Sequence, residues 1–147
     1  MKMSTKGRYG LRVMIELAGS YGRGPLTAEA IAKSQEISGK YIHLLVTNLR
    51  SAGLVRAVRG PSGGYELARH PSTITALEII IALEGSTVPV ECVADVAACS
   101  RAGRCAARDV WCDVAQAIDA LLGRLTLEEL AARQRAKIAD ASLSYSI

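Results

Sequence analysis

The stretch that most constrains the fold runs from Thr27 to Leu67. Two short segments with helical periodicity follow Thr27 and Ser38, whose side-chain oxygens can cap a helix by accepting hydrogen bonds from its first-turn amides. A turn around Ser34-Gln35-Glu36 separates the two segments. A helix, a short turn and a second helix form a helix-turn-helix.

The second of these helices separates its two faces at 100° per residue. Ile42, Leu45, Val46 and Leu49 form the core side. The other side suits DNA, because cations bind phosphates, hydrogen-bonding groups read base edges, and an exposed leucine can meet a thymine methyl. His43 could also be a merely solvent-facing histidine. The DNA contacts predicted from this helix are Ser38, Lys40, Tyr41, His43, Leu44, Thr47 and Arg50.

A β-hairpin is predicted directly after this helix. Two short runs, 54–58 and 65–67, flank the turn RGPSGG. A hairpin at this place is the wing of a winged helix, and Arg59 at its tip can enter a minor groove. Gly60 and Ser62 share the turn and are predicted contacts too. The glycine-rich turn lacks the spacing of a nucleotide-binding loop, which argues against that function.

The charge distribution favours the same half of the chain. Residues 1–70 hold eleven Lys or Arg against four Asp or Glu, whereas residues 71–147 hold seven against ten. The first half therefore carries +7 and the second −3, which indicates that the first half meets a polyanion. Ordinary surface charge is the alternative. Lys6 and Arg8, at the start of a first amphipathic helix, are predicted phosphate contacts.

Four cysteines lie within 21 residues, spaced C-x6-C-x5-C-x6-C from Cys92 to Cys112. Such a density is rarely structural in a cytosolic protein. Thiolates are soft ligands that suit iron–sulfur clusters or zinc, and the spacing lacks the paired C-x2-C of structural zinc sites. We predict an iron–sulfur cluster, [2Fe–2S] or [4Fe–4S]. A thiol redox switch and zinc are the alternatives.

The remaining helices are predicted from caps and periodicity. A capping box at Thr75 opens an apolar helix that is expected to be buried on all sides. A long helix after Cys105 carries one apolar stripe, from Trp111 to Leu125, without a comparably long partner in the chain, so a homodimer is predicted to bury it. A short last helix starts at Thr126, and the chain beyond Lys137 is expected to be loose.

Three motifs, KGRYGLRVMIEL, VRGPSGGY and TLEEL, resemble the Rrf-type winged-helix transcription regulators, with IscR-like and CymR-like members. The resemblance spans essentially the whole chain. It implies a homodimer that binds partly palindromic double-stranded DNA operators, and a long crossed dimerisation helix. In cluster-binding members, three cysteines precede that helix. Cys92, Cys99 and Cys105 match them, whereas other members have no cluster and act through a partner protein.

The fourth cluster ligand departs from the family pattern. IscR-like members have a histidine three residues after the third cysteine, where this chain has Arg108, and another branch uses an aspartate where this chain has Arg8. A guanidinium does not normally ligate iron. Cys112 and Asp109 are the leading substitutes, and Glu91 beside Cys92 is another oxygen candidate. Within one helix Asp109 would lie about 6 Å along the axis from Cys105, and Cys112 about 10.5 Å.

These observations predict a mainly α protein with a small hairpin wing. Residues 1–70 form the winged helix-turn-helix, and residues 71–147 hold the cysteine loop and the dimerisation helices. The predicted function is transcription regulation controlled by the cluster, with control by a protein partner or by thiol oxidation as the alternative. No apolar run spans a bilayer, so a cytoplasmic protein is expected. The two histidines, His43 and His70, lie far from the cysteines, which argues against an enzyme.

Overall fold

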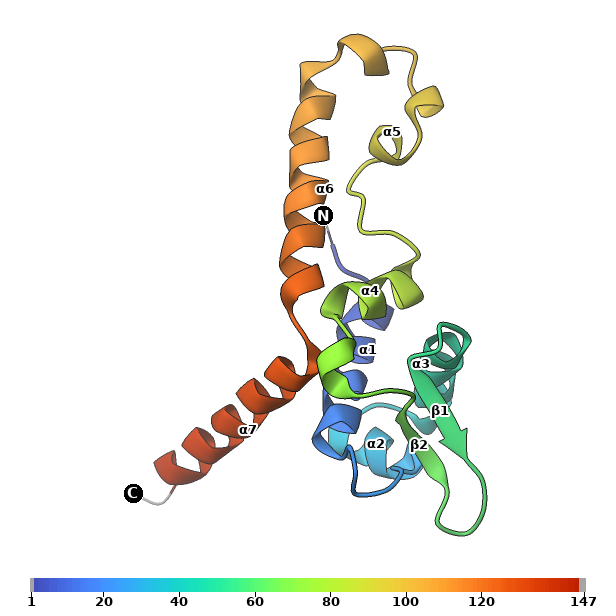
Figure 1. The fold of residues 1–147 in the computed structure, drawn as a ribbon, viewed down its shortest axis with the longest axis vertical. Helices are drawn as coiled ribbons and strands as arrows, with labels where there is room; N and C mark the ends of the chain where they lie inside the picture. Colours follow the sequence, from blue (N-terminus) through green and yellow to red (C-terminus); the bar gives the residue numbers. More distant parts are fainter. Residues whose placement is uncertain (1, 146–147) are drawn as a thin grey trace.

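The computed structural model describes residues 2–145, which form a helical body with two projecting helices (Figure 1). The helices of the body are α1 (Thr5–Gly19), α2 (Ala28–Gln35), α3 (Gly39–Ser51) and α4 (Ala76–Glu84). A hairpin of β1 (Val55–Val58) and β2 (Gly64–Leu67) follows α3, and the 3-10 turn η1 (Pro71–Thr73) leads to α4. The predicted fold class, mainly α with a hairpin wing, is confirmed.

The predicted caps are present. Thr27 and Ser38 accept backbone N–H groups at the starts of α2 and α3. Ser4, which the sequence analysis did not single out, caps α1 in the same way. The hairpin is antiparallel, with Val55 opposite Leu67 and Val58 opposite Gly64. Its first strand begins shortly after the end of α3. The helix-turn-helix and its wing are therefore specified by local features of the sequence, namely the helix caps and the hairpin turn.

One hydrophobic core joins the two halves of the chain. Fully buried residues of α1, α3 and the hairpin pack with Ile74 and Ile79, and with Leu127 and Ala131 from near the C-terminus. Helix α4 and the last helix, α7 (Leu127–Ser144), both pack along α1. The boundary at residue 70 stays a prediction, because the core runs across it.

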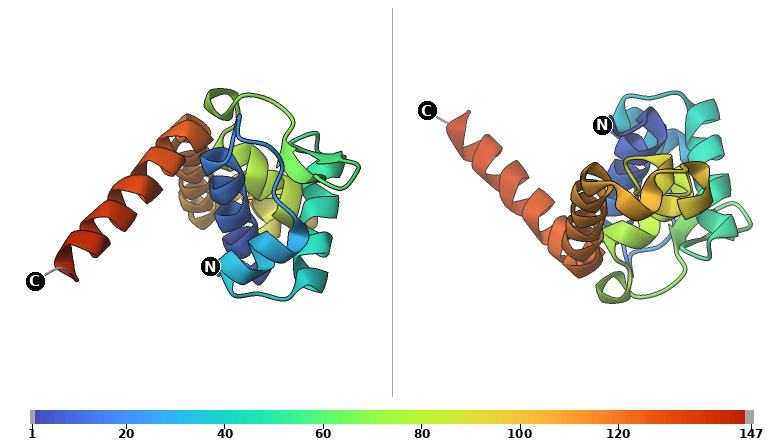
Figure 2. Two further views of the ribbon diagram at one scale, coloured as in Figure 1. Left: turned by 90° about the horizontal axis from the view of Figure 1, so that it is seen from below. Right: turned by 90° about the horizontal axis from the view of Figure 1, so that it is seen from above.

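Two long helices leave this body in different directions, as Figures 1 and 2 show. Helix α6 (Ala106–Arg124) has 19 residues, and α7 (Leu127–Ser144) has 18. The expectation of a short last helix and a loose chain beyond Lys137 is wrong, since α7 continues through seven more residues of regular helix. Residues 146–147 lie outside the described part. The capping box at Thr126 and Glu129 that opens α7 is confirmed.

The expected burial of α4 on all sides is also wrong. Its Ile79, Ile80 and Leu83 are buried, but the side chain of Ile81 is 45% exposed. Helix α4 packs on α1, α3 and α6, which together do not surround it.

The cysteine segment connects α4 to α6 as a loop of single turns. It contains α5 (Glu91–Ala94), η2 (Val96–Ala98) and η3 (Ala102–Arg104). In Figure 1 it lies beside the far end of α6, away from the hairpin. Among the described residues, no helix is long and apolar enough to cross a membrane.

Candidate functional site

The outward face of α3 carries the side chains predicted to contact DNA. Those of Ser38, Lys40, His43, Leu44, Thr47 and Arg50 are exposed, and Leu44 is exposed by 49%. The Thr47 hydroxyl donates to the His43 carbonyl oxygen at 2.7 Å, so its remaining capacity is that of an acceptor. Tyr41 is half-buried and packs edge-on against Tyr9 of α1, with ring centroids 6.2 Å apart.

Lys6 and Arg8 lie on the surface at the start of α1, and the carboxylate of Glu84 lies close to the same helix end. Positive side chains there oppose the helix dipole. Glu84 of α4 compensates, because its carboxylate accepts from the Gly7 amide at 2.9 Å and from the Ser4 hydroxyl. The two cations therefore remain exposed and available for phosphates.

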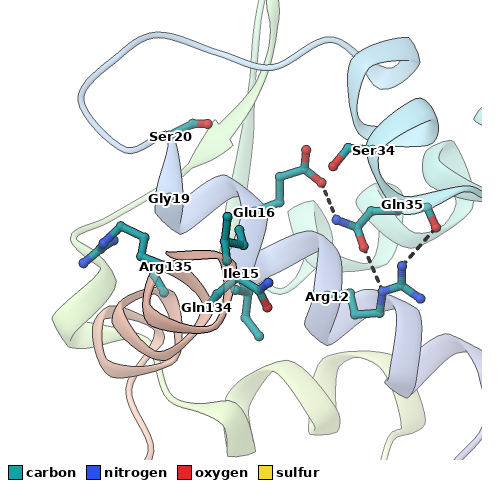
Figure 3. Close-up of a pocket in the computed structure, with 11 residues that line it drawn as sticks. Arg12, Ile15, Glu16, Gly19, Ser20, Ser34, Gln35, Gln134 and Arg135 are labelled. Carbon is teal, nitrogen blue, oxygen red and sulfur yellow. Dashed lines mark hydrogen bonds between the residues drawn. The ribbon is translucent and has the colours of Figure 1, made fainter. Parts of the chain in front are cut away.

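Arg12, one turn further along α1, is instead held by the helix-turn-helix turn (Figure 3). Its Nε donates to Gln35 Oε1 at 2.8 Å and its Nη2 to the Gln35 carbonyl oxygen at 3.1 Å. Gln35 Nε2 donates in turn to Glu16 at 2.6 Å. These groups form one wall of a groove of about 490 Å³ whose opposite wall is α7. The network fixes the end of α2, and thereby the turn that orients α3.

The wing presents Arg59, Gly60 and Ser62 at its exposed tip. Along its strands, Arg56 pairs with Glu66 at 2.8 Å. Tyr65 reaches from β2 to α3, where its hydroxyl lies 3.1 Å from His43 Nδ1. The wing and α3 are thus joined by a side-chain contact on the face of α3 that is predicted to contact DNA.

The cysteine loop holds Cys92, Cys99 and Cys105, and Cys112 lies in α6; all four thiols are half-buried and free. Cys92 lies in α5, Cys99 follows η2, and Cys105 is the N-cap residue of α6 with no side-chain cap hydrogen bond. Cys105 therefore stands at the junction between the loop and α6.

Arg108 ties the two ends of this loop together. Its Nε donates to the Cys92 carbonyl oxygen at 2.8 Å, so a side chain in the first turn of α6 holds the start of the loop. Asp109 is exposed beside it, and Cys112 lies one turn further, half-buried. Cys105 is thus the residue directly before α6, and Cys112 lies in the second turn of that helix.

The donor set fits an iron–sulfur cluster in kind but not in its present arrangement. Thiolates are the ligands that such clusters take. Across residues 2–145, however, no three Cys, His, Asp or Glu side chains come together closely enough to hold a metal ion. Metal binding at Cys92, Cys99 and Cys105 would need the loop to close.

Helix α6 leaves an apolar strip uncovered. Val110, Trp111 and Leu121 are 56%, 38% and 46% exposed, whereas Ala115 on the other side of the stripe is buried against the body. The stripe predicted from the sequence is therefore covered in part by the chain itself, on the side that meets α4.

The sequence reasoning missed several residues that build this site. Tyr9 and Tyr65 support the recognition helix, and Glu84 supports the start of α1. A tyrosine in a strand or a glutamate at a helix end has no spacing that marks it. Tyr65 lies within the wing motif VRGPSGGY, and this position is the only feature of the sequence that could have marked it as part of the site.

Comparison with known proteins identifies the family. The model of the Rrf2 family, described as an iron-dependent transcriptional regulator, matches residues 3–133. The regulator CymR of Bacillus subtilis is 45% identical over 131 residues, covering 89% of this chain and 90% of CymR. The regulator IscR of Xenorhabdus nematophila is 36% identical over 134 residues, covering 91% and 81%.

Solved structures agree. The structure of B. subtilis CymR, titled the global cysteine regulator, superposes with a TM-score of 0.77 at 44% identity, covering 90% of this chain and 98% of CymR. That of T. potens IscR gives 0.75 at 35% identity, covering 91% and 88%. These relatives are regulators of transcription and not enzymes. The exposed recognition helix, its wing and these matches place the chain in the Rrf2 family of winged-helix transcriptional regulators.

Proposed function

We propose that the chain is a sequence-specific regulator whose operator binding is set by the state of the cysteine loop, through an iron–sulfur cluster at Cys92, Cys99 and Cys105. The observation that carries the proposal is the position of the loop. It ends at Cys105, the residue that caps α6, and Arg108 links it back to Cys92. A change in the loop therefore acts directly on the start of the long helix.

DNA binding rests on the exposed face of α3, the wing tip and the start of α1. The twelve residues predicted from the sequence are the proposed contacts: the cations bind phosphates, Thr47 accepts from base edges, and Arg59 enters the minor groove. Tyr41 also supports α3 through Tyr9. Binding to an operator in double-stranded DNA is consistent with the proposed cytoplasmic location.

A homodimer is proposed from the uncovered side of α6. Three large apolar side chains, Val110, Trp111 and Leu121, are exposed along its 19 residues. A two-fold copy of the same strip would cover them, as expected for an interface that pairs one patch with itself. Two recognition helices could then reach successive major grooves about 34 Å apart.

The cluster would bring redox and iron-dependent chemistry to the loop. Cys105 lies directly before α6, and Arg108 supplies a positive charge beside Cys92. Cys112 and Asp109 stay the proposed candidates for the fourth ligand. Asp109 projects from the first turn of α6, and Cys112 from the second.

Regulation without a cluster is the second candidate. It is favoured by the separation of the thiols and by the likeness to CymR, which is described as a global cysteine regulator. Thiol oxidation or a regulatory protein partner would then act on the same loop.

Anaerobic purification distinguishes regulation through a cluster from regulation without one. The cluster predicts a coloured protein with iron and acid-labile sulfide in equal amounts, lost in Cys92→Ser, Cys99→Ser and Cys105→Ser. Comparison of Cys112→Ser with Asp109→Asn identifies the fourth ligand, since the substitution that removes a ligand lowers cluster retention. A colourless protein that binds its operator with full affinity would refute the cluster and favour the second candidate.

A further inference from the structure

The contact between Tyr65 and His43 joins the wing to the helix that faces DNA. His43 Nδ1 and the Tyr65 hydroxyl oxygen are 3.1 Å apart, and the rings meet edge-on with centroids at 6.2 Å and planes at 77°. His43 is exposed and Tyr65 is half-buried. One partner is thus anchored in the protein while the other faces the solvent where DNA would lie.

Tyr65 is anchored through its backbone as well as its ring. Its amide donates to the Leu26 carbonyl oxygen at 2.7 Å, and its own carbonyl accepts from the Leu26 amide at 2.9 Å. The ring packs against the hydrophobic core. The approach of Leu26 is so close that a Cβ on Gly64 would lie 2.3 Å from the Leu26 carbonyl oxygen. The backbone of Tyr65 is therefore fixed by Leu26, its side chain packs on the core, and its hydroxyl contacts His43.

A hydrogen bond at one imidazole nitrogen determines what the other nitrogen can do. Neutral histidine has one donor and one acceptor nitrogen, and the bond made by the first selects the tautomer. A phenol is a good donor, and the unprotonated imidazole nitrogen is a good acceptor. With Tyr65 donating to Nδ1, the proton of His43 resides on Nε2, at the outer side of the ring.

We propose that Tyr65 is a positioning residue for base recognition, which fixes the ring and the tautomer of His43 so that Nε2–H faces the major groove as a hydrogen-bond donor. The group that it would recognise is an acceptor on a base edge, such as N7 or O6 of guanine. The inference rests on the proposed operator binding and adds a residue that itself touches no base.

The test starts from duplexes that the wild-type chain selects from a randomised pool. Affinities of Tyr65→Phe, His43→Ala and the double variant are measured at one salt concentration on the selected duplex and on a scrambled one. Tyr65→Phe keeps the ring and should weaken binding to the selected duplex about tenfold, the size of one base contact, with scrambled binding unchanged. The double variant should bind no more weakly than His43→Ala, because both remove the same contact.

Tyr21→Phe is the matched control. Tyr21 meets His70 edge-on at 5.3 Å, so it offers a second tyrosine–histidine pair away from α3. It should bind both duplexes as the wild type does. The idea is overturned if Tyr65→Phe keeps its base preference, if the losses of the two single variants multiply, or if binding to both duplexes falls together.

Nitrogen NMR of the DNA-free protein gives a second readout. The wild type should show His43 protonated at Nε2, and Tyr65→Phe should show a mixture of tautomers, with His70 unchanged. A mixture already present in the wild type would contradict the proposal. If the wild type selects no duplex at all, the proposed function fails, and the tautomer measurement still decides whether Tyr65 fixes His43.

Discussion

The winged unit and the cysteine loop are built by opposite means. In the winged unit, side chains cap α1, α2 and α3, and the core residues of α3 are almost wholly buried. In the loop, from 86 to 105, the turns are single, their hydrogen bonds are mostly local, and Ala102 alone is buried. The difference indicates that the DNA-reading surface is preformed and that conformational change belongs to the loop.

The largest expected effect tests this difference by deleting core volume. Leu45 is fully buried in α3, so Leu45→Ala should lower the free energy of unfolding by about 2–5 kcal/mol. Val96 in the loop is 57% exposed, and Val96→Ala should change it by less than about 0.5 kcal/mol. Chemical denaturation measures both. Equal losses would mean that the loop carries as much of the packing as the winged unit.

The next largest expected effect on stability concerns the attachment of the wing to Leu26. Gly64 has φ of 154° and a carbonyl oxygen where a Cβ would stand, so Gly64→Ala should cost about 1–3 kcal/mol. A methyl group at Gly39 meets nothing within 4 Å, so Gly39→Ala should be neutral or stabilising by up to about 1 kcal/mol. Thermal unfolding compares the two variants. An unchanged Gly64→Ala would show that the wing is not held by Leu26.

The loop itself is tested through Arg108. Arg108→Ala removes the hydrogen bond to the Cys92 carbonyl oxygen and should cost about 1 kcal/mol or less in global stability. Hydrogen exchange should nevertheless become faster in residues 92–105, with α3 unaffected. Arg104→Ala, which removes an exposed guanidinium from the same loop, is the control. Faster exchange in α3 would contradict the separation of the two regions.

The smallest effect concerns the junction between the wing and α4. Partial burial on its own would raise the pKa of Glu78, but hydrogen bonds from Thr75 and the Arg69 guanidinium together lower it below the ordinary value of 4.5. Deprotonated Glu78 therefore stabilises the fold above about pH 4.5, and this contribution is lost as pH falls through the lower folded-state pKa. Because the group is largely exposed and screened, about 0.5 kcal/mol or less is expected. In Glu78→Gln, the free energy of unfolding measured between pH 3 and 6 should lack the pH dependence that Glu78 contributes. A pH profile identical to that of the wild type would argue against this role of Glu78.

The sequence predicts the winged unit well because its signals are local. The caps at Thr27 and Ser38, the capping box at Thr75 and the glycine-rich turn each act within a few residues. The full length of α7 is not predicted, since Leu127 and Ala131 give an apolar face only to its first turns and the later turns are mostly polar. Contacts between distant segments, such as Gly7 with Glu84, have no local signature.

The site divides in the same way. The exposed face of α3 follows from helical periodicity, and the structure places it on the surface as expected. Tyr65 and Arg108 act through hydrogen bonds across 22 and 16 residues, which no spacing rule marks. The fourth cluster ligand could not be chosen from spacing, because the choice depends on where α6 begins.

The most direct test of the account compares operator affinity with the cysteine loop in two states. Protein purified without oxygen and the same protein stripped by chelation are titrated with the selected duplex at one salt concentration. The account predicts that stripping changes the affinity by about 5–150-fold, the usual range of coupling between two sites, while α3 keeps its hydrogen-exchange protection. Equal affinities for the two forms would contradict the claim that the loop controls the preformed winged unit.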